Sequence, residues 1–422
     1  MGHPLLLVQL LVILLVSRAV SWLLRYLGQP AVIGEMIAGL VMGPMVFGAL
    51  APDAQAALFP KESLSSLNSL STLGLVLFML VVGAELRLPG GLKAQLKTAG
   101  WIGGLAVLLP MILGFAAAPL LYDGFAPAGV GFFPFAAFMA TAGAITALPV
   151  MARILKDRNL TDSLPGRLGI GAAALADALA WLLLAVVVAL ISAHGDWMPF
   201  WRTAIGLVAL TVIAFGIIRP LSQRLLDRHA PDGKPDRAVL AFLLIGALAF
   251  AAATEWLNLH AVFGAFVFGL SLPRDDRLLK SLIERIEYVA IVALLPVFFV
   301  LAGLSTTAHM SGADAGIALL LVLGVAIIGK LVGGTAGARI SGLSWRNSFA
   351  VGSLMNARGL MELIVMKVGL DAGVIDQRMF TLLLIMAIVT TMMTTPMVLA
   401  FTRSRKDATE VSSYGHKLRD QE

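Results

Sequence analysis

The stretch GIGAAALADALAWLLLAVVVALISA, residues 169–193, decides the fold of this chain. At a rise of about 1.5 Å per residue, one helix of this length crosses a bilayer. Asp177 is the only ionisable residue in the stretch. A carboxylate in the middle of a membrane span costs about 3 kcal/mol on insertion scales, and Ala or Leu would pack there without that cost. We therefore expect Asp177 to bind a proton or a small cation.

The composition predicts a membrane protein throughout. The chain is 59% hydrophobic and 13% charged, with a mean hydropathy of +0.91, whereas average globular chains are about 25% charged. The first apolar run begins at Leu5, and we interpret it as a retained span and not a signal peptide. With no Cys there is no disulfide framework and no thiolate metal site. We predict about thirteen spans, at residues 4–27, 30–50, 65–87, 97–121, 131–156, 165–193, 200–226, 237–256, 259–273, 282–305, 314–339, 346–370 and 377–402.

Basic residues give the topology. If the N-terminus lies outside, most of the 31 Lys and Arg fall in inner loops or the C-terminal tail. The outer loops hold only Lys61, Arg202 and Arg378. Basic residues concentrate on the cytoplasmic side of membrane proteins. The net charge of +6 therefore reflects topology and not a nucleic-acid partner.

The span count also suggests an internal repeat. Thirteen spans divide into six, a linker and six, so the second half is inverted relative to the first, as in many secondary transporters. Spans five and twelve hold matched helix-breaking segments, TAGAITALPV (141–150) and GSLMNARGLMELI (352–364). An ordinary kinked helix is the alternative for either span alone. Two broken spans would leave backbone groups free to face an ion.

Four polar residues converge in depth on spans five, six, eleven and twelve. Asp177 and Lys330 lie about 14–15 Å from the inner ends of their spans, Thr146 about 10 Å and Arg358 about 18 Å. We expect Asp177 to carry the proton or cation, with Thr146 and Thr141 as further oxygen ligands.

We expect Lys330 to act either as the counter-charge of Asp177 or as a second titrating group. Arg358 and Glu362 are four residues apart and are expected to pair, forming a structural core with Asn356. Glu35 and Glu85 lie near span ends, where we expect interfacial or helix-packing roles. The six His fall at ends, loops or span edges, which predicts no transition-metal site.

Several stretches together resemble one family. They are VIGEMIAGLVMGP (32–44), LGLVLFMLVVGAEL (73–86), GAITALPVMARILKDRNLTDSLPGRLGIGAAALADALAWLLLA (143–185), LHAVFGAFVFGLSLP (259–273), NSFAVGSLMNARGLMELIV (347–365) and MTTPMV (393–398). The combination, from about Gly28 to Pro396, resembles the monovalent cation:proton antiporter-2 family, nearest to plant-type cation/proton exchangers and their bacterial relatives.

This resemblance implies a sodium/hydrogen exchanger fold, a mobile core domain, a dimerising scaffold and elevator-like exchange of K⁺ or Na⁺ for H⁺. It places the family's ion-binding aspartate on Asp177, its crossing-helix threonine on Thr146 and its core lysine on Lys330. Two positions depart from the family, where Ala144 and Ala176 replace oxygen-bearing residues. Both changes leave the identity of the cation open.

The resulting expectation is an antiporter, not an enzyme, in a prokaryotic inner membrane with a cytoplasmic C-terminus. Its partners would be monovalent cations, protons, membrane lipid and a second copy of the chain, with no cofactor and no nucleic acid. Two alternatives are a cation channel and an anion-coupled or solute-coupled transporter using Lys330 and Arg358. The expected domains are scaffold helices (1–96 and 237–305), core transport domain (97–193 and 306–402), linker helix and inner loop (194–236) and a short tail (403–422).

Overall fold

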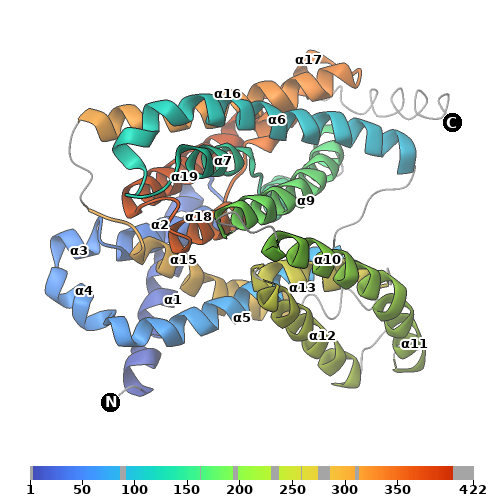
Figure 1. Ribbon diagram of the computed structural model, residues 1–422, viewed down its shortest axis with the longest axis horizontal. Helices are drawn as coiled ribbons and strands as arrows, with labels where there is room; N and C mark the ends of the chain where they lie inside the picture. The colour runs from blue at the N-terminus through green and yellow to red at the C-terminus, as the bar shows by residue number, and fades with distance from the viewer. Residues whose placement is uncertain are drawn as a thin grey trace. The chain divides into compact units, whose positions relative to one another are not determined.

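A computed structural model describes residues 3–85, 92–161, 163–192, 198–229, 237–257, 259–273, 286–308 and 313–402. Over these residues the chain is helical and contains no strand (Figure 1). Nine of the described helices are long and apolar enough to cross a membrane, and Phe132–Ala144 and Ala261–Ser271 are shorter apolar helices. The prediction of an all-α polytopic membrane protein is confirmed. The expected tail, 403–422, lies outside the described residues.

The chain divides into two compact units. The first comprises Met1–Ser17, Phe47–Arg87 and Ser192–Gly303, and the second comprises Arg18–Val46, Leu88–Ile191 and Leu304–Glu422. Residues 18–46 belong to the second unit, whereas we placed them with the scaffold from sequence. The physical reason is that the helix of residues 31–42 packs against the last helix of the chain.

The first unit is built around close contacts between two helices. Its helices are α3 (Phe47–Leu50), α4 (Pro52–Leu58), α5 (Lys61–Glu85), α10 (Met198–Ile213), η1 (Ala214–Ile218), α11 (Arg219–His229), α12 (Arg237–Trp256), α13 (Ala261–Ser271), η2 (Ala290–Leu294) and most of α15 (Leu295–Leu304). Gly83 of α5 and Gly269 of α13 each lie where a Cβ atom would overlap the other helix's backbone. Small residues allow such close packing in membranes.

The second unit holds the rest of the described helices. They are α2 (Ala31–Met42), α6 (Leu92–Phe125), α7 (Phe132–Ala144), α8 (Leu148–Asp157), α9 (Leu164–Ser192), α16 (Ala313–Ile340), α17 (Trp345–Met355), α18 (Leu360–Asp371) and α19 (Gln377–Thr402). Helix α1 (His3–Tyr26) begins in the first unit and ends in the second.

A stripe of glycines joins α16 to α6 within the second unit. Gly329, Gly333 and Gly337 are spaced four apart, so they lie on one face of α16. A Cβ atom at each would overlap the backbone of α6 at Pro110, Leu105 and Trp101. The two helices therefore run side by side at backbone contact (Figure 1). Lys330 directly follows Gly329 on α16, so the close contact between α16 and α6 sets the position of Lys330 along the helix pair.

Both predicted helix breaks are present. In span five, α7 ends at Ala144 and the chain becomes helical again as α8 at Leu148. In span twelve, α17 ends at Met355 and the chain becomes helical again as α18 at Leu360. Pro149 falls in the first turn of α8, where its missing N–H costs nothing. At the other break, a Cβ atom on Gly359 would come within 2.7 Å of Val150 Cγ2. Only glycine fits this close approach between the two broken spans.

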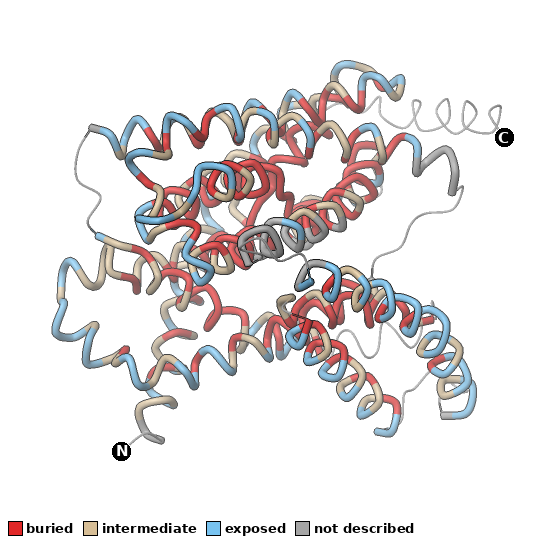
Figure 2. Tube along the Cα trace, viewed as in Figure 1, coloured by how far each residue is buried: buried red, intermediate tan, exposed pale blue. Residues whose placement is uncertain are grey.

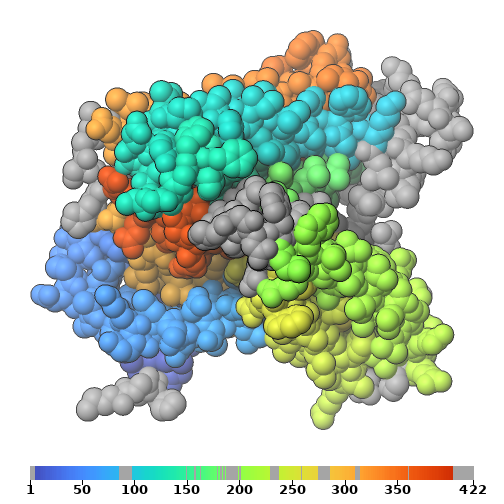
Figure 3. Space-filling model, viewed as in Figure 1, coloured from blue at the N-terminus to red at the C-terminus, as the bar shows by residue number. Residues whose placement is uncertain are grey.

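The buried part of the second unit surrounds these breaks. Figure 2 shows buried residues along α7, α17 and α19. By contrast, α6 exposes large apolar side chains, and its residues run from light blue to turquoise in Figure 3. Those side chains are Trp101, Leu108, Ile112, Phe115 and Leu120. An exposed apolar face of this kind suits contact with lipid.

Candidate functional site

The two unwound segments cross and bond to each other. The amide of Ala147 donates a hydrogen bond to the carbonyl of Ala357 at 3.0 Å. Each segment separates a helix C-terminus from a helix N-terminus, so the crossing gathers partial negative and partial positive charge in one place. Side chains of opposite charge are placed accordingly around it.

Asp177 lies at the positive end of α8. Its Oδ2 atom accepts a hydrogen bond from the Leu148 amide, the first of that helix, at 3.3 Å. The side chain comes from α9, and the residue is 3% exposed. No donor among the described residues reaches its Oδ1 atom. One carboxylate oxygen is therefore held by the helix N-terminus, while the other retains its capacity to bind a proton or a cation.

Lys330 lies at the opposite, negative end of α7. Its Nζ atom donates to the carbonyl of Ala144 and to the Thr146 hydroxyl, the second bond at 2.7 Å. Lys330 is fully buried. A cation is favoured at a helix C-terminus because carbonyl groups there have no partner within the helix. The ammonium group therefore ties α16 to the break after α7.

Arg358 binds the same helix end from the other broken span. Its Nη1 and Nη2 atoms donate to the carbonyls of Ala142 and Gly143 at 3.1 Å and 2.9 Å. Nη1 also pairs with Glu362 Oε1 at 2.7 Å, and both side chains are fully buried. This ion pair confirms the pairing predicted from their spacing. The planar guanidinium serves several acceptors at once, which a lysine ammonium in this position would not do as well.

Helix α19 holds the second break in place. The Thr391 hydroxyl accepts a hydrogen bond from the Arg358 amide and donates one to the Arg358 carbonyl, each at 2.9 Å. Asn356 Nδ2 donates to the Thr390 carbonyl at 3.1 Å. Thr390 and Thr391 were not predicted as site residues, although four threonines fall within residues 390–395. Nor was the Leu148 amide predicted, since a backbone group gives no signal in the sequence.

The structure brings most of the predicted site residues together, with two qualifications. Thr141 donates its hydroxyl hydrogen to the Ala137 carbonyl of its own helix at 2.8 Å. It shares no hydrogen bond with Asp177, Lys330 or Thr146 among the described interactions. Lys330 contacts Thr146 and α7, and within the described residues no ion pair joins it to Asp177. In this structure the side chain of Thr146, which lies in the break after α7, is bound to Lys330.

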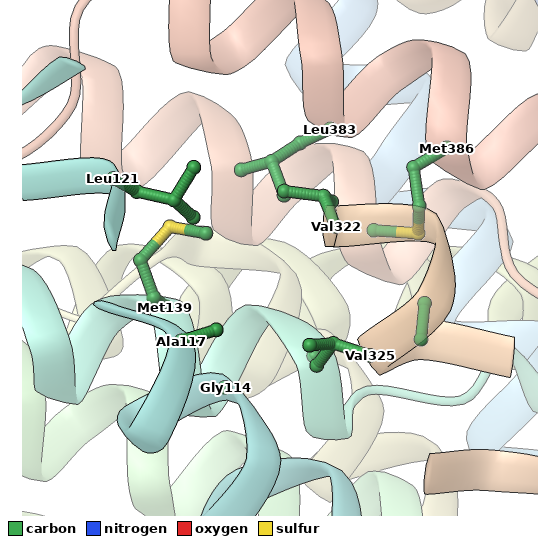
Figure 4. Close-up of a pocket in the computed structure, with 10 residues that line it drawn as sticks. Gly114, Ala117, Leu121, Met139, Val322, Val325, Leu383 and Met386 are labelled. Atoms are coloured by element: carbon green, nitrogen blue, oxygen red, sulfur yellow. The ribbon is translucent and has the colours of Figure 1, made fainter. Parts of the chain in front are cut away.

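An apolar pocket lies beside the crossing. It is lined by Gly143 and by side chains of α6, α7, α16 and α19, which include Leu121, Met139, Val325, Leu383 and Met386 (Figure 4). Hydrocarbon and thioether groups offer no ligand that replaces the water of a hard cation. The lining of this pocket therefore offers no ligands for a hard cation.

The family to which the chain belongs follows from its sequence match. Residues 11–401 match the family described as sodium/hydrogen exchanger, transmembrane. The chain belongs to this family. Within this exchanger family, the chain is 36% identical to the Na⁺/H⁺ antiporter NhaS4 of Synechocystis sp. over 396 residues, covering 93% of this chain and 96% of that protein.

Other exchangers of this family are longer. Cation/H⁺ antiporter 17 of Arabidopsis thaliana is 36% identical over 96% of this chain and 49% of its own length. K⁺/H⁺ antiporter 1 of Saccharomyces cerevisiae is 33% identical over 96% of this chain and 47% of its own length. The chain thus spans about half the length of these two relatives.

A solved structure supports the fold. The sodium proton antiporter MjNhaP1 from Methanocaldococcus jannaschii, a structure determined at pH 8, superimposes with a TM-score of 0.64 at 17% identity. The match covers 95% of this chain and 97% of that one. The chain therefore has the fold of this exchanger, as the sequence motifs predicted.

Proposed function

We propose that this exchanger family member moves a monovalent cation, Na⁺ or K⁺, across a membrane in exchange for H⁺. The observation that carries the proposal is Asp177, a buried carboxylate with one oxygen bound at the N-terminus of α8 and the other without a donor among the described residues. A proton and a cation would compete for the same carboxylate. That competition is sufficient for exchange if the site faces one side of the membrane at a time.

The arrangement around Asp177 supports each of the two bound forms. Bound cation or proton neutralises the carboxylate, so the occupied site carries little charge through the membrane. When the site is empty, the dipole of α8 and the nearby cationic side chains stabilise the charged carboxylate. Lys330 and Arg358 keep the break after α7 in place through their bonds to the carbonyls of Ala142, Gly143 and Ala144.

The contacts of the two cationic residues disfavour an anion-coupled transporter. The Lys330 ammonium already donates to a carbonyl and a hydroxyl, and Arg358 donates to two carbonyls and a carboxylate. A bound anion would have to break several of these buried bonds. A channel remains distinguishable by experiment, since it would conduct a cation current without moving protons.

We further propose that the second unit is the moving core and the first unit is the scaffold of an elevator-type exchanger. The supporting observation is that the described site residues Thr146, Asp177, Lys330 and Arg358 all belong to the second unit. A homodimer in a prokaryotic inner membrane, with its C-terminus in the cytoplasm, extends the proposal. The distribution of Lys and Arg supports this orientation.

The test of the proposed function is Asp177→Asn in proteoliposomes that contain an internal pH dye. We expect the variant to lose proton movement on addition of Na⁺ or K⁺, because a neutral amide takes up no proton at neutral pH and so cannot exchange H⁺ for a cation. Asp314→Asn is the matched control, since it makes the same change at an exposed position in the first turn of α16. We expect the control to retain exchange.

The folding of Asp177→Asn is checked by its thermal unfolding and its oligomeric state, which we expect to match those of the unaltered protein. A well-folded Asp177→Asn protein that exchanges at the normal rate would show that another residue carries the ion. Exchange under Na⁺, K⁺ and Li⁺ in turn identifies the cation.

A further inference from the structure

The turn between α16 and α17 carries two arginines and an exposed tryptophan that the proposed mechanism does not use. Helix α16 ends at Ile340, and Gly342 follows with a φ of 88°, in the left-handed region that glycine favours. The Leu343 amide donates back to the Ala338 carbonyl at 3.2 Å, a bond that closes helices of this type. The chain then continues as α17 from Trp345, and α17 packs against α16 (Figure 1).

The two arginines of the turn are each held by one backbone carbonyl. Arg339 lies in the last turn of α16, and its Nη1 atom donates to the Leu343 carbonyl at 2.6 Å. Its guanidinium carbon lies 5.2 Å from the centre of the Trp345 ring. Arg346 donates from Nε to the Phe401 carbonyl at 2.7 Å. The other N–H groups of both side chains have no acceptor among the described residues, so both remain able to bind a ligand.

Within the described residues, no carboxylate balances these two charges. No ion pair there includes Arg339 or Arg346. The first turn of α17 contains no acidic residue, and the dipole of this helix adds partial positive charge at the same place. The turn is therefore complementary to an anion.

Exposed apolar side chains accompany the charges. Trp345 is 60% exposed and Ile340 is 59% exposed. Trp101 of α6 is also exposed, and a Cβ atom on Gly337, two residues before Arg339, would meet its carbonyl. At about 1.5 Å per residue, Trp101 and Trp345 therefore lie within about one helical turn of each other in depth. Tryptophans are enriched where the hydrocarbon of a membrane meets water.

We propose that a patch formed by Arg339, Ile340, Trp345 and Arg346 binds the headgroup phosphate of an anionic membrane lipid. The planar guanidinium groups suit phosphate oxygens, and Trp345 and Ile340 contact the adjoining part of the hydrocarbon chains. A soluble phosphate compound would use the charges and leave both apolar side chains in water, so the combination favours a lipid. By the proposed topology this lipid belongs to the inner leaflet. Because α16 also carries Lys330, the bound headgroup stabilises the core at one end of that helix.

The test is thermal unfolding of the purified full chain in detergent, with increasing phosphatidylglycerol or phosphatidylcholine of the same acyl chains. We expect phosphatidylglycerol to raise the unfolding temperature to a plateau and phosphatidylcholine to change it little. The double variant Arg339→Gln, Arg346→Gln should bind phosphatidylglycerol at least about tenfold more weakly, because it loses hydrogen bonds between charged groups. Arg224→Gln with Arg228→Gln is the matched control, since it removes two exposed charges from α11, on the same proposed side of the membrane. That control should keep the full affinity.

Trp345→Ala keeps both guanidinium groups and tests the aromatic part of the patch. We expect it to bind phosphatidylglycerol about two- to fivefold more weakly, the effect of one exposed contact between a cation and a ring. Each variant is compared with its own unfolding temperature in phosphatidylcholine, so a loss of basal stability does not imitate a loss of binding.

Three results would overturn the proposal. The first is an unchanged response of the Arg339→Gln, Arg346→Gln protein to phosphatidylglycerol. The second is an equal loss in the α11 control, which would mean general attraction to the basic side of the protein. The third is an equal shift with inorganic phosphate alone, which would assign the patch to a soluble anion. None of these measurements involves ion exchange, so their outcome is independent of the Asp177→Asn test.

Discussion

Among single residues, Lys330 illustrates how a buried charge stabilises a broken helix. Its ammonium satisfies the Ala144 carbonyl, which the end of α7 leaves without a helical partner, and the Thr146 hydroxyl. We expect Lys330→Ala to lower the free energy of unfolding, because each buried acceptor left without a donor costs about 1–3 kcal/mol. The measurement is thermal unfolding in detergent, together with the Na⁺/K⁺ selectivity of exchange in liposomes.

Lys367→Ala is the matched control for this prediction. Lys367 forms an ion pair of 2.7 Å with Asp371, but the two side chains are 38% and 60% exposed. Exposed pairs contribute little to stability, so this variant should unfold close to the normal temperature. If Lys330→Ala unfolds normally but changes the Na⁺/K⁺ ratio, Lys330 acts on the cation and not on the helix break.

The individual site residues were largely predictable from sequence, because a charged residue within an apolar run stands out there and is costly to bury in a membrane. A charged side chain within a membrane span requires a function or a partner, which singled out Asp177, Lys330 and Arg358. The partners were harder to predict. Arg358 and Glu362 share one helix, so their spacing gave the pair, whereas Lys330 bonds to a carbonyl that is far away in sequence.

At the level of helices, the glycine stripe of α16 positions Lys330 against the crossing. We expect Gly333→Ala to destabilise the second unit, because the added Cβ atom would overlap the Leu105 carbonyl of α6. Forced overpacking of this kind costs about 1–3 kcal/mol. Gly324→Ala lies on the same helix with open space around its Cβ position. That control should be neutral or stabilising by about 0.5–1 kcal/mol.

Thermal unfolding of both glycine variants provides the measurement, with exchange rate as the second readout. Equal stability of Gly333→Ala and Gly324→Ala would mean that α6 and α16 adjust without cost and that their contact does not set the site.

The positions of both breaks were predicted from Gly, Pro and Asn in spans five and twelve. The hydrogen bond from Ala147 to Ala357 was not predictable, since it depends on how two distant segments cross.

At the scale of the whole molecule, the sequence alone shows how the Lys and Arg residues are distributed between the apolar runs. Apolar runs and the distribution of Lys and Arg predicted a polytopic membrane protein, because water and lipid act on every span in the same way. The grouping of α2 with the second unit depended on packing against α19, and span order gave no sign of it. The net charge that crosses the membrane in one exchange cycle also depends on the whole molecule, because it is the sum over every charged group that moves.

We predict an electroneutral cycle of one cation for one proton. Ala176 is fully buried and adds no second carboxylate beside Asp177. Lys330 donates to two oxygen acceptors, and the one-for-one cycle requires that it keep its proton throughout. Asp177 then crosses neutralised by either ion. A membrane potential would not drive such exchange, because no net charge crosses.

The measurement imposes a K⁺/valinomycin potential on proteoliposomes and follows Na⁺-driven proton flux with an internal pH dye. We expect the same flux with and without valinomycin at the same K⁺ gradient, so that only the potential differs. Ionophore-treated liposomes without protein provide the control for proton leak. Flux that rises steeply with voltage would contradict the one-for-one cycle. In that case the charge must be carried by a second group, and Lys330 is the buried candidate, since release of its proton would free both the Ala144 carbonyl and the Thr146 hydroxyl for a cation.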